Sequence, residues 1–250
     1  MKKIRELTKK ELLTISIVTV SVILAVVVVI VTVNVCTFCF GDDCWPTGRD
    51  SATVYRPTAA ETAKAEAKRN KKQVEALGKL TVPDYVTVDY INPSRARTEQ
   101  KLKAIKNIVI HYTGNAGTTA AQNRSYFGQA ETLVCSHFLV GLDGEIIQCI
   151  PLDEQSAASN QRNVDTISIE VCHPDKSGAF TYNTYLSLVK LTAWLCNNSL
   201  LDSDDLIRHH DITGKMCPKY FVDYPDKWEQ FKTDVANEQK SQKAKSGSLF

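Results

Sequence analysis

An uncharged apolar run near the N-terminus constrains this chain more than any other feature. No charged residue occurs from Leu12 to Gly41, and the stretch from Leu12 to Val33 is almost wholly aliphatic. About 20 apolar residues suffice to cross the hydrocarbon core of a bilayer as a helix. We therefore predict a single transmembrane helix over residues 12–34, which separates a short N-terminal segment from the rest of the chain.

A cleavable signal peptide and a lipid-modified cysteine are the alternatives to this helix. The apolar region of a signal peptide usually spans about 7–15 residues and ends at a small-residue cleavage site. The run here is longer, and the VNVCTFCFGDDC that follows contains no Ala-x-Ala and only a poor lipobox before Cys36. For Cys36, Cys39 and Cys44, palmitoylation, a disulfide and packing at the bilayer edge all stay open.

The charges on either side of the run predict its orientation. Five basic residues lie within the first ten positions, whereas Asp42 and Asp43 follow the run. Cytoplasmic flanks carry the excess of Lys and Arg, so we expect residues 1–11 in the cytoplasm and everything after residue 41 outside the cell. The predicted location is the cell membrane, spanned once.

Composition excludes several classes of protein. The net charge is only +2, from 30 basic and 28 acidic residues. A dedicated nucleic-acid binder would show a basic excess, so we expect no nucleic-acid partner. Eight cysteines among 250 residues are too few for a disulfide scaffold and too scattered for a repeated zinc module.

Two segments have compositions that do not build a core. Residues 35–82 include TAAETAKAEAKRNKKQVEAL, which is rich in Ala, Lys and Glu and poor in large apolar residues. This stretch predicts an extracellular stalk, as either a solvated helix or a flexible linker. Residues 238–250 are expected to form a flexible C-terminal tail.

Between these segments, residues 83–237 alternate strand-like and helix-like patterns. NIVIHYT and TISIEVC predict strands, and the two β-rich runs around Asp143-Gly144 predict a hairpin. TTAAQNRSYFGQA, the apolar spacing from Tyr182 onward and DKWEQFKTDVAN predict helices, and DDLIRHHD predicts a strand or a short turn. The fold class is therefore α/β, with a mixed central β-sheet flanked by helices and preceded by one transmembrane helix.

Histidines at the ends of two of these elements suggest a metal site. His111 ends one predicted strand, and His209 and His210 end DDLIRHHD shortly before Cys217. A catalytic zinc ion takes three protein ligands from His, Cys and carboxylates and leaves one position for water. Spacing alone leaves the alternative of a packed histidine, a surface histidine and a buried thiol, because the two elements are far apart in sequence.

The local motifs are more specific in combination. IVIHYTGN, SHFLVGLDGEIIQCIP, ISIEV and RHHDITGKMCP occur in this order and resemble the type 2 N-acetylmuramoyl-L-alanine amidase family, which includes phage lysozyme-type amidases and peptidoglycan recognition proteins. The resemblance covers roughly residues 83–236. It implies that family's fold, one Zn²⁺ per chain, and hydrolysis of the amide between the muramic acid lactyl group and L-alanine of peptidoglycan. It also implies an origin in a Gram-positive bacterium or its prophage. We expect the protein to be a monomer.

The resemblance places the family's functional residues on this chain. The zinc ligands fall on His111, on His209 within an Arg-His-x-Asp motif, and on Cys217. The catalytic carboxylate falls on Glu170, which would take a proton from zinc-activated water and pass it to the leaving amine. Lys215 would stabilise the oxyanion that develops in the transition state.

Three further residues complete the predicted site. Asp211 is expected to orient a ligand histidine or to cap a turn rather than to bind metal. We assign His137 and Asn115 to substrate binding, with packing in the core as the alternative for His137. Where many relatives carry a Trp-His segment this chain has QSAASNQRN, so the finer substrate contacts are not carried over.

Three other functions compete with the amidase. A module that binds wall fragments without cutting them is disfavoured because Cys217 and Lys215 are both present. A cysteine peptidase is disfavoured because a nucleophilic cysteine usually opens a helix beside an activating base, whereas Cys217 precedes Pro218. A wall-anchoring protein with a relict amidase-like domain is the third.

Overall fold

The computed structural model describes residues 57–247. The predicted transmembrane segment 12–34 and its flanks lie outside this range. Within the described range, no helix combines the length and the apolar character needed to cross a bilayer.

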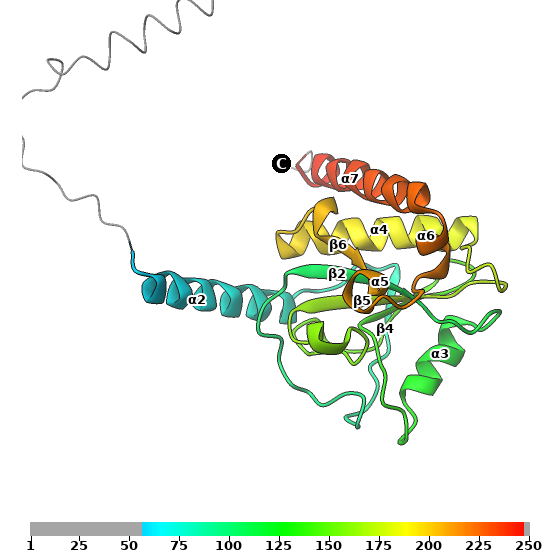
Figure 1. The fold of residues 1–250 in the computed structure, drawn as a ribbon, viewed down its shortest axis with the longest axis horizontal. Coiled ribbons are helices and arrows are strands. Elements are labelled where there is room, and N and C mark those ends of the chain that lie inside the picture. Colours follow the sequence, from blue (N-terminus) through cyan, green and yellow to red (C-terminus); the bar gives the residue numbers. More distant parts are fainter. Residues whose placement is uncertain (1–56, 248–250) are drawn as a thin grey trace, which may run out of the picture. The chain divides into compact units, whose positions relative to one another are not determined.

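A six-stranded mixed sheet forms the centre of the described region (Figure 1). Its strand order is β1-β4-β3-β5-β2-β6, and among these strands only the β3–β4 pair is antiparallel. The mixed sheet predicted from the sequence is therefore confirmed. The strands are β1 (Val86–Val88), β2 (Asn107–Tyr112), β3 (Phe138–Val140), β4 (Ile146–Gln148), β5 (Thr166–Val171) and β6 (Leu206–Arg208).

The turn at Asp143-Gly144 closes the antiparallel pair as the sequence predicted. The backbone N–H of Gly141 donates to the carbonyl of Glu145 at 2.8 Å. Gly144 has φ +89°, and a Cβ there would lie 2.9 Å from the carbonyl oxygen of Asn183. Only glycine adopts this positive φ and leaves space for the Asn183 carbonyl without strain. Gly144 therefore lets the hairpin pack closely against the helix that begins at Tyr182.

The two faces of the sheet differ in polarity, and the difference begins in the alternation of β2 and β5. Ile108 and Ile110 of β2 point with Ile167 and Ile169 of β5 into one large apolar core. The intervening side chains point to the other face and include polar ones, among them His111. Polar residues of β2 and β5 are thereby gathered on one face.

Helices cover both faces of the sheet (Figure 1). On the apolar face, α4 (Tyr182–Ser199) lies against the strands, and α7 (Pro225–Gly247) packs with it through the same core. On the polar face, α3 (Ala120–Phe127) contributes to a second, smaller apolar cluster. These three helices confirm the helical patterns predicted from the sequence. The described region also contains the short helical segments η1 (Asn160–Arg162), η2 (Ser203–Asp205), α5 (His209–Thr213) and α6 (Lys219–Asp223).

The predicted stalk ends in a helix that belongs partly to the core. Helix α2 (Ala59–Gly78) begins at a capping box between Thr58 and Glu61, and its first turns are exposed. Near its end, Val74 and Leu77 are buried in the large apolar core. The packed region therefore starts before residue 83, because these apolar side chains cover part of the same core as α4.

The predicted C-terminal tail is helical as far as the structure describes it. Helix α7 continues past residue 238 to Gly247, and Gln239 is buried. The Gln239 side-chain amide donates to the carbonyl of Leu201 at 3.3 Å and to Oδ1 of Asn197 at 3.4 Å. These polar contacts hold a stretch whose composition alone predicted flexibility.

Candidate metal site and groove

The sheet places the two predicted histidine ligands at the same level. Strands β2 and β6 are parallel neighbours with Ile110 opposite Arg208, so the residues that follow, His111 and His209, lie beside each other. Their ring centroids are 4.7 Å apart, with the planes tilted by 58°. Both imidazoles are buried.

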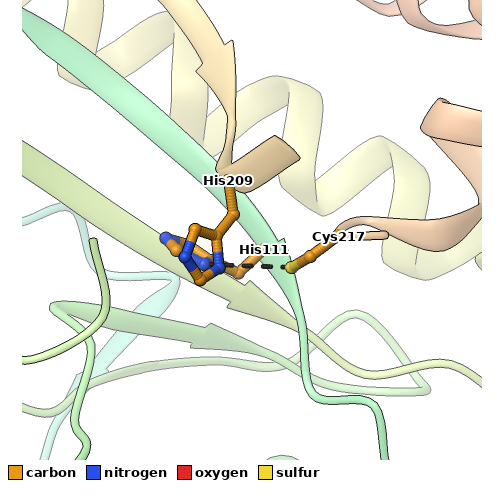
Figure 2. Close-up of side chains that lie close together, drawn as sticks. All are labelled: His111, His209 and Cys217. Carbon is orange, nitrogen blue, oxygen red and sulfur yellow. Dashed lines mark hydrogen bonds between the residues drawn. The ribbon is translucent and has the colours of Figure 1, made fainter. Parts of the chain in front are cut away.

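Cys217 joins the two histidines through a tight loop. Gly214 ends α5 with φ +75°, and the chain then turns back so that the backbone N–H of His210 donates to the carbonyl of Cys217 at 2.8 Å. The Cys217 Sγ atom lies 3.9 Å from Nδ1 of His111 (Figure 2). One ligand atom from each of His111, His209 and Cys217 lies within 4.8 Å of the others. The structure thus brings together the three predicted ligands, and His210 is not among them.

This donor set suits a zinc ion. Zinc bonds of about 2.0–2.3 Å in a tetrahedron put ligand atoms about 3.5 Å apart, so small side-chain shifts would close the site. Burial lowers the pKa of His111 well below its usual value and also lowers that of His209, and this direction favours the neutral ring that a metal ligand needs. Burial raises the pKa of Cys217 to about 12, so the thiol gains its charge only when a cation is present.

Two loop residues that the sequence did not single out contact the ligand histidines. The Nε2 atom of His209 lies 2.9 Å from Oδ1 of Asn160, and Nε2 of His111 lies 3.3 Å from Oγ of Ser159. Both residues come from the QSAASNQRN segment. A polar loop without periodicity gave no signal for this role.

Glu170 and Lys215, the predicted catalytic pair, both border the same hollow as the metal site. Glu170 lies opposite His111 in the β2–β5 register, and its Oε2 atom is buried without a hydrogen-bond partner. Burial raises its pKa to about 8, and the nearby Lys215 ammonium acts in the opposite direction. Lys215 is exposed on the loop before Cys217.

The hollow is an open groove of two adjoining parts. The larger part has a volume of about 780 Å³ and is lined by His209, Cys217, Lys215, Glu170 and Asn160, among others. The smaller, of about 340 Å³, shares with it Thr113, Tyr126, Phe127, Val134 and Glu170. Asn115, which the sequence assigned to substrate binding, is exposed and lines this smaller part.

His137 does not face the groove, so the assignment to substrate binding is corrected. Its side chain is fully buried. The backbone N–H of Ser168 donates to Nδ1 at 3.0 Å, and Nε2 donates to the carbonyl of Glu154 at 2.9 Å. Both ring nitrogens are thus used within the core, and burial lowers the pKa of His137 to about 4.

Asp211 caps α5, which is one of the two roles expected for it. Its carboxylate accepts from Nη2 of Arg208 at 2.7 Å, from Nε of Arg208 at 3.1 Å and from the Arg208 backbone N–H at 2.8 Å. These bonds hold the backbone at the point where β6 passes into the helix carrying His209. None of the described hydrogen bonds of Asp211 goes to a ligand histidine.

Comparison with known proteins supports the resemblance to an amidase family. The sequence profile described as N-acetylmuramoyl-L-alanine amidase matches residues 101–220, which contain His111, His209 and Cys217. This segment is similar to the type 2 amidase family. A solved structure, the catalytic domain of XlyA, superposes on the chain with a TM-score of 0.54 at 24% identity, covering 60% of this chain and 98% of that one. That likeness supports the fold.

Curated relatives of this amidase domain come from bacilli. The chain is 34% identical over 156 residues to the N-acetylmuramoyl-L-alanine amidase BlyA of Bacillus subtilis (strain 168), which covers 54% of this chain and 42% of the relative. It is 29% identical over 139 residues to CwlL of Bacillus licheniformis, which covers 49% and 38%. The chain therefore spans less than half the length of these relatives.

Proposed function

We propose that this protein is a zinc-dependent N-acetylmuramoyl-L-alanine amidase that hydrolyses the amide between the lactyl group of muramic acid and L-alanine in peptidoglycan. The observation that carries the proposal is the convergence of His111, His209 and Cys217 beside an open groove. The match of residues 101–220 to the amidase family and the activity named for the bacillar relatives support the same reaction.

The residues around the metal site have the chemistry that this reaction needs. A zinc ion held by the three ligands would lower the pKa of its water to about 7 and polarise the scissile carbonyl. Glu170 accepts a proton from the attacking water and returns it to the leaving amine. A pKa raised toward neutrality by burial suits a carboxyl group that must both take and give a proton. Lys215 lies at the groove with its ammonium available to the developing oxyanion.

The groove also suits a polymeric substrate. Lys215 lines one part, Asn115 lines the other and Glu170 lines both, so the groove would hold more of the substrate than the scissile bond. The exposed apolar side chains of Tyr126, Leu133 and Val134 line one wall. Side chains of this kind contact the apolar faces of sugars and the methyl groups of a peptide.

We further propose that residues 12–34 anchor the protein in the cell membrane of a Gram-positive bacterium, whether the protein comes from the bacterium or from its prophage. The support is the uncharged apolar run and the basic residues before it. The amidase domain would then act as a monomer on the wall outside the membrane.

The test is hydrolysis of purified cell walls by the full-length protein in detergent. We expect new N-terminal alanine to appear, to stop after treatment with a chelator and to return when zinc is added. Reducing sugar released in place of alanine would identify a glycosidase and contradict the proposal.

His209→Ala and His210→Ala make a matched pair for the same assay. The two histidines are adjacent, but only His209 belongs to the ligand cluster. We expect His209→Ala to lose both zinc and activity, and His210→Ala to keep the zinc. Equal zinc content in the two variants would show that the ligands are assigned wrongly.

A further inference from the structure

We infer that Asn160 and Ser159 are positioning residues that set the metal-binding geometry of the two ligand histidines. The inference rests on the zinc site proposed above. It assigns a role to a loop whose sequence, QSAASNQRN, suggested no function.

The first support is that consecutive residues of one loop contact the same atom of each histidine. Asn160 Oδ1 lies 2.9 Å from Nε2 of His209, and Ser159 Oγ lies 3.3 Å from Nε2 of His111. An amide oxygen can only accept, so the proton of His209 is on Nε2. Nδ1 of His209 is then left for a metal. In His111 the contact with Ser159 also occupies Nε2, and Nδ1 is the atom that lies near the Cys217 thiol.

The second support is the backbone of the loop. Asn160 has φ +53°, a left-handed conformation that is uncommon for residues other than glycine and is tolerated best by Asn and Asp. This conformation occurs where the 3-10 segment η1 begins and the Asn160 side chain reaches the metal site. A residue held in such a conformation beside a candidate active site is a reason to look for a role.

The third support is that other residues hold the loop in place. Asn163 Oδ1 accepts from the backbone N–H of Ser159 at 2.7 Å and from that of Ala158 at 3.2 Å. The Arg162 guanidinium donates to Asp165 at 2.7 Å and to Oδ1 of Asn107 at 2.5 Å. The two contacts to the histidines therefore come from a braced segment.

The physical consequence concerns affinity for the metal. A hydrogen bond from the far nitrogen of a ligand histidine fixes its tautomer and the direction of its ring, and it makes the ligating nitrogen more basic. Loss of such a partner typically lowers metal affinity by about 10–100-fold. The longer contact, from Ser159, should matter less than that from Asn160.

The test uses the full-length protein and three variants. Asn160→Gly removes the amide but permits the left-handed backbone, Asn160→Asp keeps an oxygen acceptor, and Ser159→Ala removes the hydroxyl. Zinc affinity is measured by competition with a chromophoric chelator. The cobalt(II) absorption spectrum and the melting temperature of the metal-free protein are recorded for each.

We expect Asn160→Gly to bind zinc about 10–100-fold more weakly, with a metal-free melting temperature close to that of the wild type. Asn160→Asp should restore the affinity, and Ser159→Ala should show a smaller loss. The thiolate–cobalt charge-transfer band should remain in all variants, while the ligand-field bands shift in Asn160→Gly. A purely structural role for Asn160 would not move these bands.

Two results would overturn the inference, and they differ from failure of the proposed function. If Asn160→Gly binds zinc as tightly as the wild type, or if Asn160→Asp fails to restore a lost affinity, Asn160 does not position His209. If the wild-type protein itself binds no zinc, the proposed function fails and the positioning role falls with it.

Discussion

His137 and the pair His111 and His209 differ in the hydrogen-bond partners of their ring nitrogens. His137 has a partner on each ring nitrogen, in the backbone N–H of Ser168 and the carbonyl of Glu154. His111 and His209 have a hydrogen-bonding oxygen only at Nε2. Burial is similar in both groups, so burial does not separate a structural histidine from a metal ligand. The partner of the second ring nitrogen does, because Nδ1 of His111 lies beside the Cys217 thiol, whereas both nitrogens of His137 contact backbone groups of the core.

The surroundings strengthen this contrast. Behind His137, Glu154 forms a buried ion pair with Arg97, with Nε–Oε2 at 2.8 Å, and Ser168 donates to Oγ of Ser156 at 2.8 Å. Beside His111, Glu170 keeps an unpartnered buried oxygen. A network in which every polar group is paired holds a core together. An unpaired group such as the Glu170 carboxylate can instead bond to a substrate or take part in a proton transfer.

The largest effect should follow from removing the thiol ligand. Cys217→Ser replaces the anionic sulfur ligand by a neutral hydroxyl, so zinc affinity should fall by more than the roughly hundredfold that outer-shell changes reach. Wall hydrolysis should fall to background. Zinc per chain, measured after dialysis, checks this. A variant that keeps one zinc ion per chain would remove Cys217 from the metal site.

Glu170→Gln should separate catalysis from metal binding. The amide cannot accept the proton of the attacking water, so activity should fall by about 10²–10⁴-fold. Zinc content should stay as in the wild type, because Glu170 is not among the clustered ligands. Alanine release and zinc content measured on the same samples decide between these roles, and an active Gln variant would show that the base lies elsewhere.

His137→Ala should cost stability and leave the metal site alone. The substitution leaves the buried Ser168 N–H and the Glu154 carbonyl without a hydrogen-bond partner and creates a cavity. The free energy of unfolding should therefore fall by about 2–4 kcal/mol. Urea unfolding measures the loss. A folded variant that also lost zinc affinity would show that His137 supports the metal site.

The lowered pKa of His137 should make the stability of the fold depend on pH. Its pKa is about 4 in the fold, whereas an unfolded histidine titrates near 6.5, so the unfolded chain binds the extra proton first. Stability from this group is complete above about pH 6.5 and declines toward pH 4, by at most about 3 kcal/mol. In NMR spectra the His137 ring signals should stay at their neutral positions down to about pH 5. A midpoint near 6.5 would contradict the buried, doubly bonded ring.

The sequence predicted the elements well and the site through its motifs. Helical spacing from Tyr182 and the turn at Gly144 are local signals, and the structure confirms both. The meeting of His111 with Cys217 depends on the register of β2 and β6 and on a backbone bond from His210, which no local pattern contains. Only the resemblance to a family brought these residues together before the structure did.

The remaining residues were missed for physical reasons that can be named. Asn160 lies in an aperiodic loop, and a left-handed conformation has no sequence signature apart from a mild preference for Asn. His137 was misassigned because a histidine beside an apolar run has the same local pattern whether it faces the core or a groove. The packing of α2 was missed because two apolar side chains, Val74 and Leu77, carry it.

The packing of α2 determines where a soluble fragment of this protein should be cut. Gln73 donates to the carbonyl of Ser199 at the end of α4, and the buried side chains of Val74 and Leu77 follow directly. A fragment begun at residue 83, where the family motifs suggest a boundary, would expose the hydrophobic surface that this turn covers and would invite aggregation. An expression clone that begins at Pro57 keeps both the turn and the Thr58 cap that starts its helix.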